Sequence, residues 1–242
     1  MKKVLDEGSV TSQLDGQLYP YQIQVLDGGD LSELCDFQQA TYQKMADRTL
    51  YAPIPDEMIR AVLGRKGLTL GLMIQGRIFG FVCFYFPGDD AENLGRDAGL
   101  PEQELENVVH WERCLIDPEF RGNHLQFRLG ELLVNATTAL DRNYRYMCAT
   151  VAPTNYPSLH QLFEQQKMVA VALKKKYGNL WRFVFFQDIL RPVQMLPEGV
   201  ITVGGSEYER QAELFKQGFY AFQALQDEEQ MKILFAKPRP VC

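Results

Sequence analysis

The sequence lacks the cysteine and histidine patterns that hold structural metals or disulfide frameworks. Its five cysteines and three histidines form no CxxC pair and no combined cluster, and most cysteines stand in apolar stretches, where a thiol behaves as a small hydrophobic group. We therefore expect no metal site, no disulfide framework and a reducing, cytoplasmic location. No apolar run is long enough to span a membrane and the N-terminus has no signal-peptide core, so we expect a soluble protein without a membrane partner.

Basic residues are also scarce. Lysine and arginine number 25 against 31 aspartate and glutamate residues, which gives a formal net charge of −6. Nucleic-acid-binding proteins usually carry a basic balance or stripe, so we expect no nucleic-acid partner, and the charge favours a cationic or amine ligand. At 242 residues and 46% hydrophobic content, the chain can form one large domain, or a domain with an accessory unit.

Apolar periodicity predicts alternating strands and helices over residues 19–190. Strands are expected at residues 21–25, 68–74, 77–86, 108–116, 146–151, 169–177 and 181–187, and helices at 31–46, 56–64, 126–142 and 155–166. Residues 1–18 are polar and predict a loose arm or a short helix at best. A change to proline and glycine predicts a boundary before residues 191–242, an accessory helix capped by Ser206 with Glu209 and then a hairpin.

The stretch from Val108 to Arg142 joins an apolar strand to a long amphipathic helix through a short loop. The first backbone amides of a helix have no internal acceptor and lie at the positive end of its dipole. An anion, in first place a phosphate group, suits that position. An ordinary strand-to-helix connection is the alternative.

The order of elements and three motifs resemble the GNAT superfamily of acyl-CoA-dependent N-acetyltransferases over about residues 21–189. The first motif is LIDPEFRGNHLQ, from Leu115 to Gln126, which resembles the family's strand end followed by an Arg/Gln-x-x-Gly-x-Gly/Ala loop. Arg121 matches that pattern, whereas His124 and Gln126 replace its two glycines. The resemblance implies an α/β fold with a mixed, mostly antiparallel central sheet flanked by helices, and a small α+β extension after it.

In the family this loop turns consecutive amides toward the cofactor pyrophosphate, and the strand before it presents backbone groups to the pantetheine and the thioester. The resemblance therefore implies that acetyl-CoA is held by Leu115, Ile116, Arg121, Gly122, Asn123, His124, Leu125 and Gln126. A side chain at position 124 can crowd the pyrophosphate, or His124 can add a hydrogen-bond donor to it.

The second motif is VAPTNYPSLHQLFEQQKM, which resembles the family's strand followed by Asn-x-x-Ser/Ala at the head of a helix. Asn155 and Ser158 match it, and the resemblance implies that Asn155 binds the pantetheine arm, although a helix N-cap is an equally ordinary role. Many family members carry a tyrosine on this helix as general acid for the departing thiolate. This chain has Phe163 at about that position, with Tyr156 as a nearby substitute that points elsewhere.

The third motif is Glu112, which shares one face of its strand with His110. The resemblance implies an acidic residue here near the acceptor amine, and a partly buried carboxylate suits the removal of a proton from an ammonium group. A salt bridge is the alternative for Glu112. His110 either shares the catalytic duty or is a packed histidine with one hydrogen bond.

Two further groups are expected to be structural. The run Lys174-Lys175-Lys176 alternates between two faces of its strand, so a solvated edge strand explains it better than a clamp for the 3′-phosphate of the cofactor. The aromatic residues of the last strand are expected in the core: Trp181, Phe183, Phe185 and Phe186.

The resemblance as a whole implies an acetyl-CoA-dependent N-acetyltransferase that acts on a primary amine of a small molecule or peptide by direct attack. A catalytically weak acyl-CoA sensor on the same fold is the alternative, because of His124 and Phe163. The segment after residue 191 lies outside the resemblance and can cover the acceptor pocket, cover the sheet edge or exchange with a second subunit in a homodimer.

Overall fold

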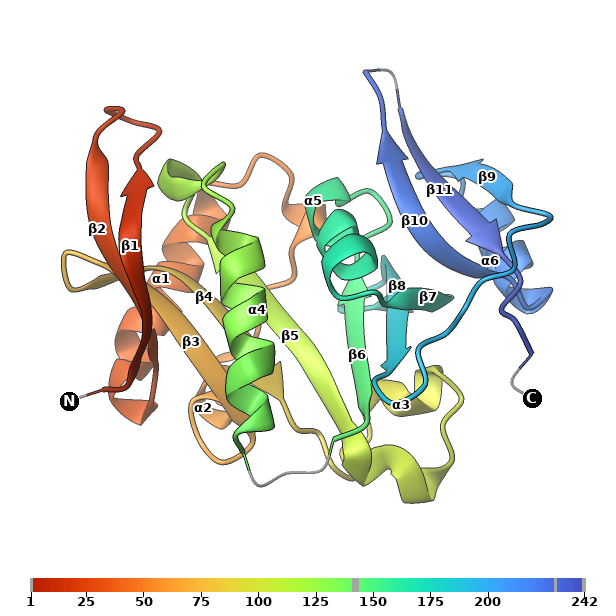
Figure 1. Cartoon of the computed structure of the whole chain (residues 1–242), viewed down its shortest axis with the longest axis horizontal. Helices are drawn as coiled ribbons and strands as arrows, with labels where there is room; N and C mark the ends of the chain where they lie inside the picture. The colour runs from red at the N-terminus through yellow and green to blue at the C-terminus, as the bar shows by residue number, and fades with distance from the viewer. Residues whose placement is uncertain (1, 141–143, 229, 241–242) are drawn as a thin grey trace. The chain divides into compact units, whose positions relative to one another are not determined.

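The computed structural model describes residues 2–140, 144–228 and 230–240 (Figure 1). The chain forms two compact units, the first from Met1–Phe86 and Trp111–Arg142 and the second from Pro87–His110 and Asn143–Cys242. The predicted division into residues 1–18, 19–190 and 191–242 is a different partition, and it stays a prediction.

The first unit is built on an antiparallel sheet with helices on both faces. Its strands are β1 (Val4–Thr11), β2 (Leu18–Val25), β3 (Gly67–Ile74) and β4 (Arg77–Tyr85), followed by β5 (Val108–Ile116), which enters this unit at Trp111. Helices α1 (Leu31–Gln43) and α2 (Asp56–Val62) cover one face, and α4 (Leu125–Thr138) covers the other (Figure 1). The 3-10 turns are η1 (Gly28–Asp30), η2 (Arg48–Leu50) and η4 (Pro118–Phe120).

Alternate residues of β4 face the helices α1 and α2. Phe81, Cys83 and Tyr85 lie in one buried cluster with Leu34 of α1 and Ile59 of α2. The predicted hairpin between β3 and β4 is confirmed, because Gln75 and Gly76 both take the positive φ that a tight two-residue turn requires.

The second unit contains a further antiparallel sheet in the order β6, β8, β7, β10, β11, β9. The strands are β6 (Tyr146–Val151), β7 (Val169–Lys176), β8 (Leu180–Asp188), β9 (Ile201–Gly204), β10 (Tyr220–Gln226) and β11 (Met231–Ala236). The helical segments are α3 (Leu94–Asp97), η3 (Glu102–Asn107), α5 (Tyr156–His160), the π-helical turn η5 (Gln161–Gln165) and α6 (Tyr208–Lys216). Of the predicted core aromatics, Phe183 and Phe185 are fully buried.

The prediction of a loose arm or short helix for residues 1–18 is wrong. Residues Val4–Thr11 form β1, which pairs antiparallel with β2 along its length. The strand lies at the end of the sheet and only one of its eight residues is buried, so its polar sequence is compatible with backbone pairing although it carries no strong apolar pattern. Val10 is its buried anchor.

Several predicted boundaries also need correction. The N-cap of α6 is Glu207 rather than Ser206, and no side chain caps this helix start, since the Glu207 carboxylate accepts from the Gly204 amide outside the helix. The long loop predicted over residues 87–104 contains α3 and the start of η3. The predicted end of the long helix at Arg142 lies outside the described residues, within which α4 ends at Thr138.

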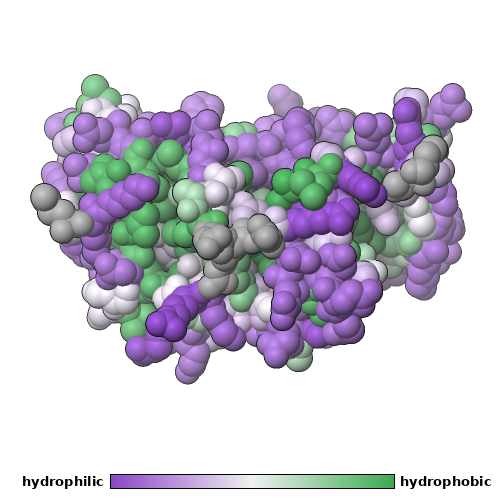
Figure 2. Space-filling model, turned by 60° about the horizontal axis from the view of Figure 1, so that its bottom comes forward, coloured by the Kyte–Doolittle hydropathy of each residue, from purple (hydrophilic) through white to green (hydrophobic). Residues whose placement is uncertain are grey.

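Two findings concern the polarity of the surface and the length of the helices in the described residues. On the face seen in Figure 2, apolar residues lie in patches separated by polar ones. Within residues 2–140, 144–228 and 230–240, no helix is both long and apolar enough to cross a membrane.

Candidate functional site

The junction after β5 is fixed by a buried aromatic group and a capped turn. Asp117 accepts from the Glu119 amide at 2.9 Å and so caps η4, while Lys44 donates to the same carboxylate at 3.0 Å. Phe120 is buried against Phe79, with ring centroids 5.0 Å apart in an edge arrangement. The chain therefore leaves the strand at a defined angle and enters the loop that leads to α4.

Two residues of this loop take left-handed backbone conformations. Gly122 has φ +81° and His124 has φ +56°. His124 stands where the GNAT pattern has its first glycine, so it adopts the backbone conformation that a glycine would favour. Within the described part of the chain, the amides of Gly122, His124 and Leu125 have no hydrogen-bond acceptor, and these three amides lie at or just before the N-terminus of the 14-residue helix α4. The loop can therefore present backbone donors to an anion despite its missing glycine.

The conformation of His124 gives a first testable prediction. Replacing His124 with glycine removes the clash of a Cβ in the left-handed region, and we expect the free energy of unfolding to rise by about 0.5 to 1 kcal/mol. Urea unfolding measures this change. A matched control is Lys167→Gly, since Lys167 is exposed and also left-handed at φ +53°, far along the chain from this loop. The control should gain similar stability, and a loss of stability in His124→Gly would contradict the assigned conformation.

The predicted cofactor-binding residues of the loop differ in whether their backbone or their side chain is available. Leu125 is buried, so only its backbone amide is available, and Gln126 is half-buried. The Arg121 Nε donates to the Ile116 carbonyl at 3.2 Å, which ties its exposed side chain back to the end of β5. The side-chain amide of Asn123 is engaged with Thr11 and Phe120.

A glycine lets β4 approach the end of β5 closely. A Cβ at Gly80 would lie 2.7 Å from Cδ1 of Ile116 and 3.1 Å from the Leu115 carbonyl oxygen, so a side chain there would require both neighbours to shift. Leu115 and Ile116 are themselves buried. Gly80 thus fixes the position of the two strand residues that were predicted to present backbone groups to the cofactor.

Glu112 is half-buried in the middle of β5. Burial raises the pKa of its carboxyl above the usual value of 4.5, and the positive charge of Arg113 offsets part of that effect. Among the described residues, no hydrogen bond or ion pair engages this carboxylate, so the alternative of a salt bridge for Glu112 is not realised there. A carboxylate with a raised pKa and no bonded partner is suited to accept a proton.

Arg113 connects this part of β5 to the segment between α1 and α2. Its guanidinium donates to the Ala52 carbonyl and lies 4.3 Å from the ring centroid of Tyr51. The Tyr51 hydroxyl donates to Gln38 Oε1 at 3.0 Å, and the same Gln38 oxygen accepts from the Ile54 amide. The sequence offered no signal for this connection, because Gln38 and Tyr51 are helix and loop residues with no chemical pattern around them.

His110 has the packed arrangement, the second of its two predicted possibilities. It is 4% exposed, and its Nε2 accepts from the Leu94 amide at 3.0 Å. Burial lowers the pKa of His110 to about 3. The residue is therefore neutral at physiological pH and its Nε2 lone pair is occupied, which suits it to hold the start of α3 rather than to take a proton.

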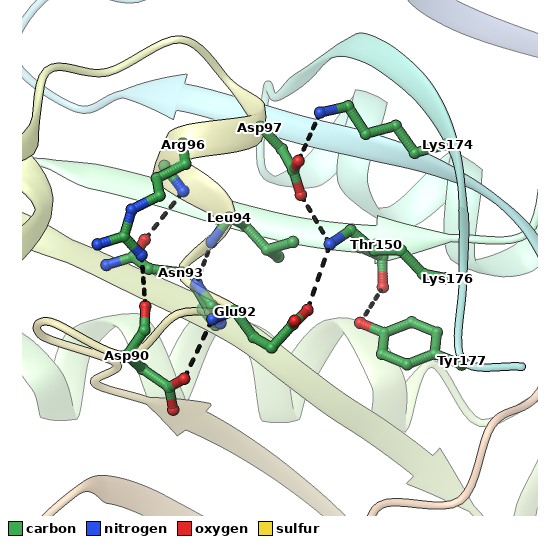
Figure 3. Close-up of polar contacts among 12 residues, drawn as sticks. Asp90, Glu92, Asn93, Leu94, Arg96, Asp97, Thr150, Lys174, Lys176 and Tyr177 are labelled. Carbon is green, nitrogen blue, oxygen red and sulfur yellow. Dashed lines mark hydrogen bonds and ion pairs between the residues drawn. The ribbon is translucent and has the colours of Figure 1, made fainter.

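Charged residues hold the same segment against β7 (Figure 3). Asp97 is bonded by Lys174 at 2.5 Å and by Lys176 at 2.7 Å, and Lys176 also lies 3.7 Å from Glu92. Burial alone would raise the pKa of Asp97, but the two lysines outweigh it and hold the pKa below its usual value. At Lys174–Lys176, β7 pairs with β8 alone, because β10 meets β7 only at Ala170, so this end of β7 is a free edge with Lys174 and Lys175 exposed, as predicted. The prediction did not include the ion pairs of Lys174 and Lys176 with Asp97.

The second predicted motif forms the start of α5. Asn155 is its N-cap, and Oδ1 accepts from the Ser158 amide at 3.4 Å, so the ordinary capping role is confirmed. Phe163 is buried against Phe185, with ring centroids 4.9 Å apart. The Tyr156 ring lies 5.7 Å from that of His160 on the same helix. The position of the family's tyrosine is thus part of the core and carries no hydroxyl.

A metal site has no support in the residues that the structure describes, where no group of three or more histidine, cysteine, aspartate or glutamate side chains could hold an ion.

The comparison with solved structures shows that the chain has the GNAT fold. No family model matches the chain, and no curated protein matches it either. Arabidopsis thaliana NAA60, solved in complex with acetyl-CoA, aligns at 14% identity and a TM-score of 0.53 over 71% of this chain and 99% of its own. An acetyltransferase of the GNAT family from Streptococcus pneumoniae aligns at 14% identity and a TM-score of 0.51, over 70% and 99%. The loading GNATL domain of CurA from Lyngbya majuscula aligns at 16% identity and a TM-score of 0.50, over 70% and 98%.

Proposed function

We propose that this chain, which has the GNAT fold, is an acetyl-CoA-dependent N-acetyltransferase that acetylates a primary amine of a small molecule or peptide. The observation that carries the proposal is the left-handed His124, which gives the loop before α4 a glycine-like backbone and leaves three amides without an acceptor among the described residues. The complex of the Arabidopsis neighbour with acetyl-CoA supports the choice of cofactor.

In this proposal the residues of the first unit divide the work between the cofactor and the amine. The amides of Gly122, His124 and Leu125 bind the pyrophosphate, assisted by the dipole of α4. Leu115 and Ile116 present backbone groups to the pantetheine and thioester, and Arg121 adds positive charge beside the loop. In the second unit, Asn155 and Ser158 are proposed to bind the pantetheine arm.

Acetyl-CoA supplies the activated acetyl group. Glu112 takes a proton from the ammonium form of the substrate, directly or through water, so that the freed nitrogen lone pair can attack the thioester carbonyl. The C–N bond forms, the nitrogen gives up a second proton to become the amide, the C–S bond breaks, and the thiolate takes up a proton to leave as the thiol. Phe163 has no hydroxyl, so water or another group delivers that last proton. No covalent acyl-enzyme is required.

Two measurements test the function in sequence. Calorimetry with acetyl-CoA should show binding, and release of free thiol against a panel of primary amines should then show turnover. The absence of acetyl-CoA binding would contradict the proposal outright. Binding without thiol release over a broad panel would instead favour the acyl-CoA sensor, which the buried Phe163 in place of a tyrosine supports.

We also propose that the protein works in the cytoplasm. Cys35, Cys83, Cys114 and Cys148 are free thiols, and this supports a reducing, cytoplasmic location. The homodimer predicted as an option for residues 191–242 stays a prediction.

A further inference from the structure

Asn123 pairs with the end of β1 as a neighbouring strand would. Its Oδ1 accepts from the Thr11 amide at 3.0 Å, and its Nδ2 donates to the Thr11 carbonyl at 2.8 Å, across 112 positions of sequence. Nδ2 also donates to the Phe120 carbonyl at 3.1 Å. Both polar atoms of the side-chain amide are therefore engaged by the protein itself, so this side chain is placed to shape the loop rather than to contact a ligand.

The turn after β1 bonds to the same loop. The Gln13 amide donates to the Glu119 carbonyl at 2.7 Å, and the Gln13 side chain donates to the Arg121 carbonyl at 3.1 Å. Ser12 Oγ donates to the Glu119 carboxylate at 2.9 Å. Together with Asn123, these contacts occupy the carbonyls before the helix, whereas the amides of Gly122, His124 and Leu125 have no acceptor within the described ranges.

The bonds of Asn123 lie at the most constrained point of the loop. Gly122 and His124, on either side of Asn123, are both left-handed. A non-glycine residue keeps such a conformation only where its surroundings fix it. The same strand is tied to α4 by Arg128, which bonds both oxygens of Asp6 at 2.9 and 2.8 Å. The N-terminal hairpin therefore holds the loop from one side and the helix from another.

We propose that the N-terminal hairpin, residues 4–25, is a part of the cofactor site, with Asn123 as the positioning residue that keeps the pyrophosphate-binding amides in place. This inference rests on the proposed function, because it assumes that those amides bind the cofactor. Strand β1, which the sequence predicts as part of a loose arm, thus affects the affinity for the cofactor through its contacts with Asn123.

The test replaces Asn123 with alanine in the full chain. We expect the Kd and the KM for acetyl-CoA to rise at least tenfold, with kcat at saturating acetyl-CoA unchanged, because the loop must be ordered by the cofactor instead of by Thr11. The KM for S-acetylpantetheine, which has no pyrophosphate, should stay as in the wild type. Tyr19→Phe is the matched control, since it removes only an exposed hydrogen bond to Asp15 within the same hairpin.

Each outcome separates this inference from the proposed function. If wild type binds acetyl-CoA and Asn123→Ala binds it equally well, the hairpin has no positioning role while the function stands. An equal rise of KM for S-acetylpantetheine would show a general loss of structure and would also overturn the inference. Failure of the wild type to bind acetyl-CoA would overturn both. Should Asn123→Ala not fold, Ser12→Ala removes the bond to the Glu119 carboxylate, together with the bond that Ser12 Oγ accepts from the Leu14 amide, and should raise the Kd in the same direction by less.

Discussion

Replacing Glu112 with glutamine is expected to lower kcat by a factor of about 10² to 10⁴, the usual contribution of a general base. The amide keeps the shape of the side chain but cannot take a proton from the amine. The Kd for acetyl-CoA should not change, because the loop that is proposed to bind the pyrophosphate begins beyond Ile116, the last residue of β5, whereas Glu112 lies in the middle of the strand. Initial rates of thiol release with a fixed amine, together with calorimetry, measure both quantities.

The pH dependence of the same variant identifies the proton acceptor. Since burial raises the pKa of Glu112 above 4.5, the wild-type kcat should rise with pH through a midpoint above that value, as the carboxyl becomes the base form. Glu112→Gln should lack this ascending limb. A wild type and a variant with the same turnover and the same limb would remove Glu112 from the mechanism.

At neutral pH, Glu112→Gln should raise the free energy of unfolding although it lowers kcat. A carboxyl whose pKa is raised in the folded state favours the folded state at low pH, and that contribution is lost as pH rises from the unfolded value through the folded one. At neutral pH the wild type therefore bears the cost of a half-buried, ionised Glu112, and Glu112→Gln should be more stable by ~1 kcal/mol. The gain should shrink as the pH falls toward 4.5.

Glu33 offers a matched control for both effects. It is also half-buried in the first unit, but its carboxylate accepts from the Ile78 amide at 2.9 Å, a bond that a glutamine oxygen can keep. Glu33→Gln should leave kcat and the pH profile unchanged. A similar loss of turnover in Glu33→Gln would point to a general effect of removing a carboxylate from this unit.

The sequence predicts those elements whose apolar pattern is strong and locally complete. The strands at residues 108–116 and 146–151 were predicted with the bounds that the structure gives them, because each is a mostly apolar run ended by a turn signal. β1 was missed because its pairing depends on β2 rather than on its own composition. β9 was missed for the same reason, since it is a four-residue strand that pairs with β11.

The sequence predicts where the candidate site lies along the chain, but it does not predict the backbone conformation or the side-chain contacts of that site. The pattern around Arg121 marks the loop, yet the side chain of His124 argues against a glycine-like turn, and only the backbone of the folded chain shows that the turn forms. The partners of Asn123 and Asp97 lie 112 and 77 positions away in the sequence, so no local pattern reveals them. Residues that hold a site in place are fixed by tertiary contacts, whereas residues that carry the chemistry leave a local motif.

Replacing Gly122 with valine should show the effect of the backbone conformation of the loop apart from the effect of its side-chain contacts. Gly122 has φ +81°, and a Cβ there would meet only Gln13 Nε2 at 3.5 Å, so the substitution causes no severe clash and its cost is conformational. A β-branched residue is a strong outlier at this φ, so we expect the loop to change its backbone and turn its amides away from the pyrophosphate. Because a hydrogen bond to a charged group contributes about 1.5 to 3 kcal/mol, the Kd for acetyl-CoA should rise roughly 10- to 100-fold.

Gly76→Val is the control that shows whether weaker acetyl-CoA binding results from the changed loop or from backbone strain in general. Gly76 has φ +75° in the β3–β4 hairpin and has open space around its Cβ position, so valine imposes the same conformational penalty away from the cofactor loop. Urea unfolding should show similar losses of stability in both variants, while calorimetry should show weaker acetyl-CoA binding in Gly122→Val alone. If both variants bind acetyl-CoA with equal affinity, binding does not depend on the left-handed backbone of this loop. That result would contradict the proposed phosphate-binding role of the junction after β5.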